Sequence, residues 1–530
     1  MRLNFRDVAD GALLVEFPEA AQAEANRQAV AIARCLGRKP PAGFFDAVAG
    51  ARAVLLVFEP RKLSRSRLAQ SARQVRAGTA LVESPRRALR LPVLYGGAAA
   101  PDLPELSRAA GVSEQEFAAR HAAAAYTVAF LGFAPGFAYL TGLPAELQAP
   151  RLSTPRTRVP EGSVAIGGEY TGIYPAQMPG GWKVIGRAPV RLFDSRQDPP
   201  ALFAPGDEVR FEPIGPEEFE WRRQRVFLRQ EPSAADSGPP LFRVTGPGLW
   251  TSVQGGPRPG GSIFGVPPGG AMDQKALAEG NAVLGNACDV AALEITLSGP
   301  VLEALEDCTV SLAGGGVAAE QNGKPLAGAG VFEVARGDRL RFGAVQNGAR
   351  TYLCVAGGLG QPSRPEPSRR REVGETVFGA ASTGRGSRRA RLSSVSPVAA
   401  WPRELNIRVV LGPQEDRFEP EGLATFLSSA YRVLSASDRR GVRLEGSVIA
   451  RKGAADIPPE GTALGAIQVA NDGLPIILGP DRPVTGGYTK IATVIGADFP
   501  LVAQAAPGTL LRFAPVGLEE ALTARAGLPF

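Results

Sequence analysis

The chain has 530 residues, of which 44% are hydrophobic and 21% charged, and a formal net charge of +7 at pH 7. This length supports two to four globular domains, each able to bury its own core. Only seven of the 59 basic residues are lysine, a bias that reflects genome composition more than a nucleic-acid partner, so we expect none. Uninterrupted apolar runs are too short to span a bilayer, and acids stand where a signal peptide would be apolar, which predicts no membrane association.

Cysteine and histidine, which form disulfides or bind zinc, are scarce in the chain. Four cysteines, Cys35, Cys288, Cys308 and Cys354, are scattered without a Cys-x-x-Cys pair, which indicates a reduced, cytoplasmic protein. His121 is the only histidine, so a two-histidine metal motif is excluded. The sequence also lacks a P-loop, a Gly-x-Ser-x-Gly elbow and a biotin-attachment Met-Lys-Met, so another chain would have to carry any biotin.

Residues 1–95 predict an N-terminal ferredoxin-like unit of β-α-β-β-α-β order. The expected elements are a strand at 12–17, a helix at 20–36, strands at 44–48 and 53–58, a helix at 62–76 and a returning strand at 88–94.

Residues 96–221 predict a β-rich module. The capping box Ser113–Glu116 opens a short helix that carries His121, and a strand follows at 126–130. The stretch 130–189 is then unusually dense in glycine and proline. Glycine permits close backbone approach and proline fixes φ, so this density predicts shaped loops on a β scaffold, a common setting for a binding site.

A charged, proline-containing stretch at 222–240 predicts the linker to a second module, 241–530. Within that module, residues 361–402 are rich in Arg, Ser and Pro. They predict a mobile surface loop, with a basic interaction arm as the alternative.

Short sequence echoes connect the modules. PGDEVRF (205–211) is echoed by RGDRLRF (336–342) and PGTLLRF (507–513), and GGWKVIG (180–186) by GGYTKIATVIG (486–496). These echoes predict that several modules share one barrel-like β architecture.

Longer motifs carry a family resemblance. The first half resembles the allophanate hydrolase subunit 1 family, which includes the B subunit of bacterial 5-oxoprolinase and the Kip-type kinase inhibitor; its motifs are FLGFAPGF (130–137), TPR (154–156), GSVAIGG (162–168), TGIYP (171–175) and PGGW (179–182). The second half resembles the subunit 2 family, which includes the 5-oxoprolinase C subunit, the antagonist of the kinase inhibitor and the carboxyltransferase region of urea carboxylase; its motifs are GVPPGGAMD (265–273), ALEITLSGP (292–300), SDRRGVRLEG (437–446), GAIQV (465–469) and TGGYTKIATVIGAD (485–498).

The resemblance implies an α+β, mostly β fold: a ferredoxin-like unit followed by cyclophilin-like β-barrel modules. It implies a fused B–C component of ATP-dependent 5-oxoprolinase, which uses ATP with Mg²⁺ and a separate A subunit to open 5-oxoproline to L-glutamate. One alternative is a biotin-dependent carboxyltransferase acting on urea or another amide. The other is a non-enzymatic regulator that binds and inhibits a histidine kinase. A homo-oligomer is compatible with each of these functions.

In the first module, His121 is the candidate general acid or base, because the family has a histidine at this place. The alternative is a helix-end histidine bonded to backbone. Arg156 and Arg158 are candidates to clamp a carboxylate or phosphate, with Lys183 and Arg187 nearby. The alternative for these cations is a solvated surface charge.

In the second module, Asp273 and Lys490 are the candidate catalytic residues. Asp273 is also placed to cap the helix that follows it, and with Glu294 it is a candidate metal ligand. Gln468 and Arg482 are candidate polar neighbours of Lys490 in binding substrate or nucleotide. The hypothesis predicts that His121→Ala and Lys490→Ala each abolish turnover with little loss of folding.

Four places depart from the usual family pattern. Gly255 replaces an acid, Tyr170 stands where glutamine is common, Met178 replaces a serine, and GAAST (379–383) lacks an arginine. The loss of a carboxylate and an arginine from glycine-rich loops places the activity of the second module in question.

Overall fold

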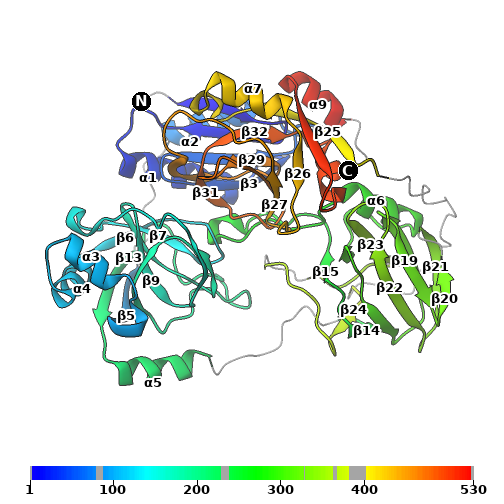
Figure 1. Ribbon diagram of the computed structural model, residues 1–530, viewed down its shortest axis with the longest axis horizontal. Helices are drawn as coiled ribbons and strands as arrows, with labels where there is room; N and C mark the ends of the chain where they lie inside the picture. The colour runs from blue at the N-terminus through cyan, green and yellow to red at the C-terminus, as the bar shows by residue number, and fades with distance from the viewer. Residues whose placement is uncertain are drawn as a thin grey trace.

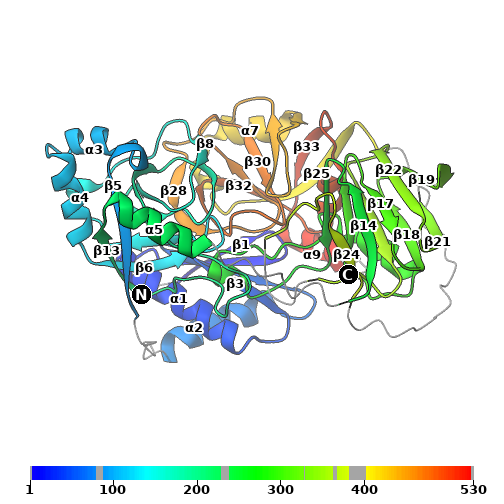
Figure 2. The ribbon, with the colours of Figure 1, turned by 90° about the horizontal axis from the view of Figure 1, so that it is seen from below.

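In the computed structural model the chain folds into four units: an N-terminal sheet with two helices, a first closed barrel, a two-sheet sandwich and a second closed barrel. Figure 1 shows the N-terminal unit (blue) beside the second barrel (orange), with the first barrel (cyan) and the sandwich (green) on opposite sides. The view from below in Figure 2 has the same arrangement. The predicted mostly β, α+β fold with barrel modules is confirmed. The structure describes residues 3–78, 87–227, 238–326, 329–361, 367–380 and 401–526.

The N-terminal unit is an antiparallel sheet of order β1-β2-β4-β3, with two helices packed on one face. The returning strand expected at 88–94 is wrong for this unit, because that segment is β5 of the first barrel. The sheet edge beside β2 is instead occupied by β1, which precedes it in the chain. The elements are β1 (Asn4–Val8), β2 (Ala12–Glu16), α1 (Gln22–Arg38), β3 (Phe44–Ala49), β4 (Ala53–Phe58) and α2 (Arg65–Gly78).

The first barrel closes in the order β10-β7-β6-β13-β5-β12-β9, and a two-stranded ribbon, β8–β11, lies beside it. Alternate strand residues such as Val164 and Ile166 fill its interior. The predicted capping of α4 is confirmed, since the Glu116 amide donates to Ser113 Oγ at 3.1 Å. The elements are β5 (Ala88–Tyr95), α3 (Leu103–Ala109), α4 (Glu114–Ala123), β6 (Tyr126–Leu131), β7 (Ala138–Thr141), β8 (Arg156–Val159), β9 (Ser163–Gly167), β10 (Tyr170–Ile173), β11 (Met178–Gly180), β12 (Lys183–Arg187), β13 (Glu208–Pro213) and α5 (Pro216–Phe227).

The third unit is a sandwich of a six-stranded and a five-stranded sheet. The echo RGDRLRF forms β22 here, so its assignment to a barrel is wrong; a tight turn followed by alternating apolar residues suits any antiparallel strand. The elements are β14 (Pro240–Gly246), β15 (Trp250–Gln254), α6 (Gln274–Val283), β16 (Ala292–Thr296), β17 (Val301–Ala304), β18 (Cys308–Gly314), β19 (Val317–Gln321), β20 (Lys324–Leu326), β21 (Gly330–Val334), β22 (Arg339–Val345), β23 (Arg350–Val355) and β24 (Thr376–Phe378).

The second barrel repeats the connectivity of the first. Its order β25-β32-β29-β30-β27-β26-β33 matches the first barrel strand for strand, with the same parallel pair between first and last strands and the same ribbon, here β28–β31. The echoes in the two barrels are therefore equivalent strands. The elements are β25 (Glu404–Leu411), α7 (Pro420–Ser428), β26 (Tyr431–Val433), β27 (Gly441–Glu445), β28 (Asp456–Gly461), β29 (Ala466–Val469), β30 (Pro475–Leu478), β31 (Thr485–Tyr488), β32 (Lys490–Val494), α8 (Phe499–Gln504), β33 (Leu510–Pro515) and α9 (Leu518–Ala526).

Two predicted boundaries change. The linker 222–240 begins inside α5, and β14 begins at its last residue; 228–237 lie outside the described residues. The predicted loop 361–402 contains the strand β24 in its described part, while 362–366 and 381–400 lie outside it.

The two halves of the chain are packed against each other. The free face of the N-terminal sheet packs on the second barrel, where Leu14 and Leu55 meet Ala466 in one apolar cluster. A loop of the first barrel also docks there, since the Phe133 amide donates to Thr485 Oγ1 at 3.0 Å. The sandwich contacts the second barrel as well, through α6 and α8. The second barrel therefore contacts each of the other three units.

Candidate functional site

His121 lies in the core of the first barrel and is fully buried. Its Nδ1 is 2.8 Å from the Tyr95 hydroxyl and its Nε2 is 3.0 Å from Thr171 Oγ1, so both ring nitrogens have internal partners. Burial lowers the pKa of His121 to about 3. A neutral, enclosed imidazole cannot reach a substrate directly.

The second barrel shows what occupies the equivalent position. His121 stacks on Phe211 with ring centroids 4.8 Å apart, and Phe426 stacks on Phe513 at 4.6 Å. His121 precedes the buried Tyr126 by five residues, and Phe426 precedes the buried Tyr431 by five. Each pair lies where a helix leads into the second strand of its barrel. His121 is thus the counterpart of a core phenylalanine, and the structure favours a packing role.

The predicted cations of the first barrel have partners inside the protein. Arg156 makes two hydrogen bonds to Asp102, of 2.8 and 2.7 Å, so it does clamp a carboxylate, but an internal one. Lys183 Nζ lies 2.8 Å from Glu105 Oε1.

The other two cations of this set are also dispersed. Arg187 Nε donates to the Glu161 carbonyl at 2.9 Å. Arg158 is exposed beside the Gln177 side chain, whose amide oxygen, once turned towards it, accepts at 2.8 Å. These four predicted ligands therefore do not converge on one site.

The glycine-rich motifs of the first barrel serve aromatic packing. A Cβ at Gly167 would lie 2.5 Å from the Trp182 ring, and one at Gly180 would overlap Tyr174. Tyr170, one of the family departures, belongs to the same cluster, and Met178 packs against it. Because these glycines have no side chain, the aromatic rings lie flat against the strands. The glycine-rich region is therefore tightly packed.

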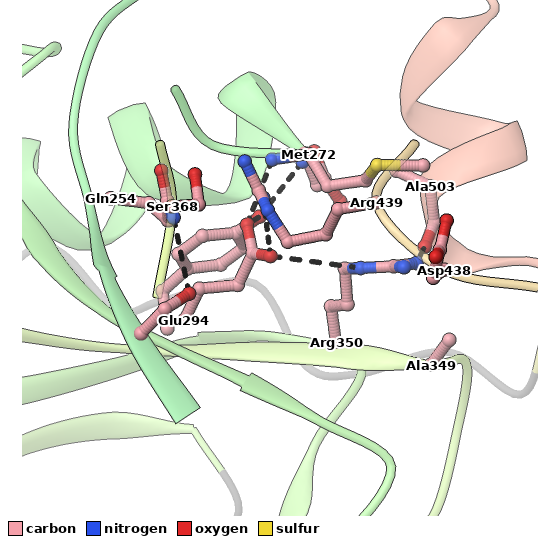
Figure 3. Close-up of polar contacts among 12 residues, drawn as sticks. Gln254, Met272, Glu294, Ala349, Arg350, Ser368, Asp438, Arg439 and Ala503 are labelled. Carbon is pink, nitrogen blue, oxygen red and sulfur yellow. Dashed lines mark hydrogen bonds and ion pairs between the residues drawn. The ribbon is translucent and has the colours of Figure 1, made fainter. Parts of the chain in front are cut away.

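A charged cluster joins the sandwich to the second barrel. Glu294 Oε1 accepts from Arg439 Nη1 at 2.6 Å, and Arg350 Nε lies 3.8 Å from the same oxygen. Arg439 also donates to Asp481 at 2.8 and 3.0 Å. Figure 3 shows the two arginines converging on Glu294. We call Glu294, Arg350, Arg439 and Asp481 the arginine centre.

The carboxylate of Glu294 has internal donors on both oxygens. Its Oε2 accepts from the Met272 amide at 2.8 Å and from the Tyr352 hydroxyl at 2.7 Å. Burial acts to raise the pKa of Glu294, but Arg439 and Arg350 outweigh it and hold that pKa below its usual value. The centre holds two carboxylates and two guanidinium groups, and this balance of charge suits a structural contact between the two units.

Asp273 is both a helix cap and a buried acid. Its Oδ1 accepts from the Ala276 amide at 3.0 Å, as predicted for a cap, and its Oδ2 accepts from Gln504 Nε2 at 2.7 Å. Burial raises the pKa of Asp273 to about 6, despite these hydrogen bonds.

This pKa predicts a pH dependence of stability. An aspartate in the unfolded chain titrates near 3.9, so between about pH 4 and 6 the folded protein holds a proton that the unfolded chain has lost. Stability from this group is therefore present at low pH and falls as pH rises, by about 3 kcal/mol in total. Urea unfolding of wild-type protein and Asp273→Asn across this range checks it: the gap between the two should change by that amount, and parallel profiles would contradict it.

Asp273 and Glu294 do not fit a metal site. Each carboxylate is occupied by internal donors, and the described part of the chain holds no group of three His, Cys, Asp or Glu side chains placed to hold a metal. The possibility that this pair binds Mg²⁺ is therefore not supported by the geometry.

A second polar cluster lies on the outer face of the second barrel. Lys490 Nζ is 2.7 Å from Glu460 Oε1, which also accepts from Gln414 Nε2 at 2.7 Å. Gln468 is the cross-strand neighbour of Lys490. We call Lys490, Glu460, Gln414 and Gln468 the lysine centre. All four residues are nine-tenths or more buried.

Arg482 connects the two centres. It follows Asp481 directly in the chain, and its Nε donates to the Thr462 carbonyl at 3.0 Å, two residues from Glu460. Burial lowers the pKa of Arg482 to about 10. The structure thus brings the predicted Lys490, Gln468 and Arg482 into one region. Asp273 and Glu294 lie in the adjoining contact between the sandwich and the second barrel.

Sequence reasoning missed several members of these centres. Arg439 and Glu460 were not singled out, although Arg439 lies in the SDRRG motif. Gly255 stands where the family usually has an acid, and the structure gives a steric reason for the glycine. A Cβ there would lie 2.7 Å from Gln361 Oε1 and 2.9 Å from the Asp289 carbonyl. For GAAST, residues 381–383 lie outside the described chain.

Two family models match the two halves of the chain separately. Residues 3–203 match the family described as carboxyltransferase domain, subdomain C and D, and residues 264–515 match subdomain A and B. The B subunit of 5-oxoprolinase from Bacillus subtilis is 33% identical over 231 residues, 41% of this chain and 96% of that protein. The chain belongs to this carboxyltransferase-domain family.

The second half has its own relative. The C subunit of 5-oxoprolinase from Escherichia coli K12 is 31% identical over 305 residues, 54% of this chain and 94% of that protein. The crystal structure of the protein TTHA0988 is 33% identical with a TM-score of 0.81, covering 95% of this chain and 99% of that one. The predicted family resemblance is confirmed, and the chain joins a B-like and a C-like half in one polypeptide. Among the described helices, none has the length and apolar character needed to cross a bilayer.

Proposed function

We propose that this chain is the fused B–C component of an ATP-dependent 5-oxoprolinase, acting in the cytoplasm with a separate A subunit to open 5-oxoproline to L-glutamate. The observation that carries the proposal is that one chain contains, in order, counterparts of nearly whole B and C subunits. Their contact through the N-terminal sheet and the second barrel supports a single working unit.

An unstrained lactam resists attack by water, so its carbonyl oxygen must be activated before the ring C–N bond can break. When bound, ATP supplies a phosphoryl group that turns that oxygen into a leaving group. The residues predicted to hold nucleotide in the first barrel, Arg156, Lys183 and Arg187, are engaged internally and do not fit this task. We assign substrate binding instead to the lysine centre, where buried donors from Lys490 and Gln468 can orient and polarise a carbonyl group.

The test is turnover by the purified chain together with its A subunit. We expect ADP and glutamate to form only when ATP and 5-oxoproline are both present. No lactam-dependent turnover, with an A subunit that is active with another B–C pair, would refute the proposal.

The family description favours one second candidate, a biotin-dependent carboxyltransferase acting on urea or another amide. Biotin would have to be carried by another chain. Transfer of a carboxyl group from carboxybiotin to urea, without lactam-dependent ADP formation, would favour this candidate over the first.

The same assay decides the role of His121. We expect His121→Phe to retain turnover, because Phe426 fills the equivalent place in the second barrel. Its free energy of unfolding should fall by about 1–3 kcal/mol, since the partly buried Tyr95 hydroxyl loses its partner. Urea unfolding measures the loss; abolished turnover at unchanged stability would return His121 to the catalytic residues.

A further inference from the structure

The lysine centre contains buried donors that the described protein leaves unsatisfied. Among the described residues, Gln468 Nε2 has no hydrogen-bond partner, and Lys490 Nζ makes a close ion pair with Glu460 without the geometry of a directed hydrogen bond. Lys490 is 1% exposed and Gln468 8%. Each unsatisfied buried donor destabilises a fold, so this pair needs a reason to be present.

The fold itself does not require polar residues here. In the first barrel, the strands equivalent to β32 and β29 pair Val184 with Ala165, and the Trp182 ring belongs to the same apolar cluster. Val184 follows Trp182 by two residues in PGGWKV, as Lys490 follows Tyr488 in TGGYTK. Lys490 and Gln468 thus replace apolar packing with two donors.

Gly486 lets the Gln468 amide lie directly against the backbone of β31. A Cβ at Gly486 would lie 2.6 Å from Gln468 Nε2. The N-terminal half covers the neighbourhood, since the Ala51 amide donates to the Pro459 carbonyl at 2.7 Å, beside Glu460. The first-barrel loop contacts Thr485, directly before Gly486.

The charge balance selects the kind of acceptor. Glu460 already neutralises Lys490, so a carboxylate bound here would leave a net negative charge in a buried place, which is costly. A neutral carbonyl oxygen satisfies both donors and adds no charge.

We infer that Lys490 and Gln468 form a binding site for the carbonyl oxygen of an amide or lactam, assembled where the N-terminal half meets the second barrel. The inference rests on the proposed function for its substrate, and it assigns the lactam carbonyl of 5-oxoproline, rather than its carboxylate, to this cluster.

The test combines stability with binding of three probes to the purified full chain. 2-Pyrrolidinone has the lactam carbonyl without the carboxylate, L-proline has the carboxylate without the lactam, and 5-oxoproline has both. We expect Gln468→Leu to weaken 5-oxoproline and 2-pyrrolidinone by about tenfold and to leave proline unchanged. We also expect its thermal midpoint to equal or exceed that of wild type, because an unsatisfied donor has been removed.

The matched control is Thr351→Val, which removes a buried hydroxyl that likewise has no hydrogen-bond partner among the described residues, in a sandwich strand. It should leave binding of all three probes unchanged. The inference is overturned if wild type binds neither lactam, if Gln468→Leu binds both normally, or if its midpoint falls. A further outcome is that wild type binds the lactams and Gln468→Leu does not, while wild type with its A subunit forms no glutamate. The carbonyl site would then stand, and the assignment as an oxoprolinase would be wrong.

Discussion

Replacing Arg439 with methionine should lower the free energy of unfolding by about 3–5 kcal/mol, because the buried Glu294 and the partly buried Asp481 lose the cation closest to them. Arg439 is 5% exposed and bonds Glu294 at 2.6 Å and Asp481 at 2.8 and 3.0 Å. It also donates to the Gly270 carbonyl at 2.7 Å. Burial acts to lower its pKa, but the two carboxylates outweigh it and raise that pKa above its usual value. Urea unfolding measures the loss.

The neighbouring arginine is the control. Arg440 Nη2 lies 2.8 Å from Asp438, but both side chains are about half exposed. Arg440→Met should cost less than about 1 kcal/mol, as exposed ion pairs do. Adding Asp481→Asn to Arg439→Met should restore much of the stability, since Glu294 and Arg350 then remain as a balanced pair. Equal losses at 439 and 440 would contradict a stabilising role specific to the buried cluster.

Short-range features of this fold could be predicted from the sequence. The caps at Ser113 and Asp273 depend on a side chain and an amide three residues apart, a distance that a local pattern records. The echo between GGWKVIG and GGYTKIATVIG predicted a shared architecture, because equivalent strands need similar turns and alternation. The strand at 88–94 was also found locally, but its partner, β13, could not be inferred from its own residues.

Long-range pairing limited prediction of the site. Arg156 binds a carboxylate, as expected, but the partner is Asp102, 54 residues away in the chain, and not a ligand. Glu294 and Arg439 are 145 residues apart. The residue type of a cation shows which groups it can bind, but not whether the protein itself already provides such a group. The predicted set therefore contained residues with internal partners together with candidate ligand-binding residues. In the same way, the residue type of His121 did not reveal its burial, which decides against contact with a substrate.

The largest effect on activity should come from Lys490. We expect Lys490→Met combined with Glu460→Gln to lower kcat for 5-oxoproline by about 10²–10³, the effect of losing one donor to a carbonyl oxygen that gains charge in the transition state. The double change removes the ion pair as a unit, so no unpaired charge stays buried. Gln414 keeps an acceptor in the new amide at 460, since its Nε2 now donates to Glu460 Oε1. Stability should therefore change little while turnover with the A subunit falls.

An ion pair between the C-terminal helix and the N-terminal unit distinguishes the loss of a charge pair from the loss of a contact with the ligand. Arg525 Nη1 lies 3.1 Å from the buried Asp10 and ties the C-terminal helix to the N-terminal unit. Arg525→Met with Asp10→Asn removes a more exposed pair outside the lysine centre, and the Gly496 amide keeps its acceptor at residue 10. Glu59, the other partner of Arg525, keeps its ion pair with Arg61. This control should retain kcat. If both double variants lose turnover equally, Lys490 acts through the packing of the halves; if only the Lys490 variant loses it, the lysine acts on the substrate.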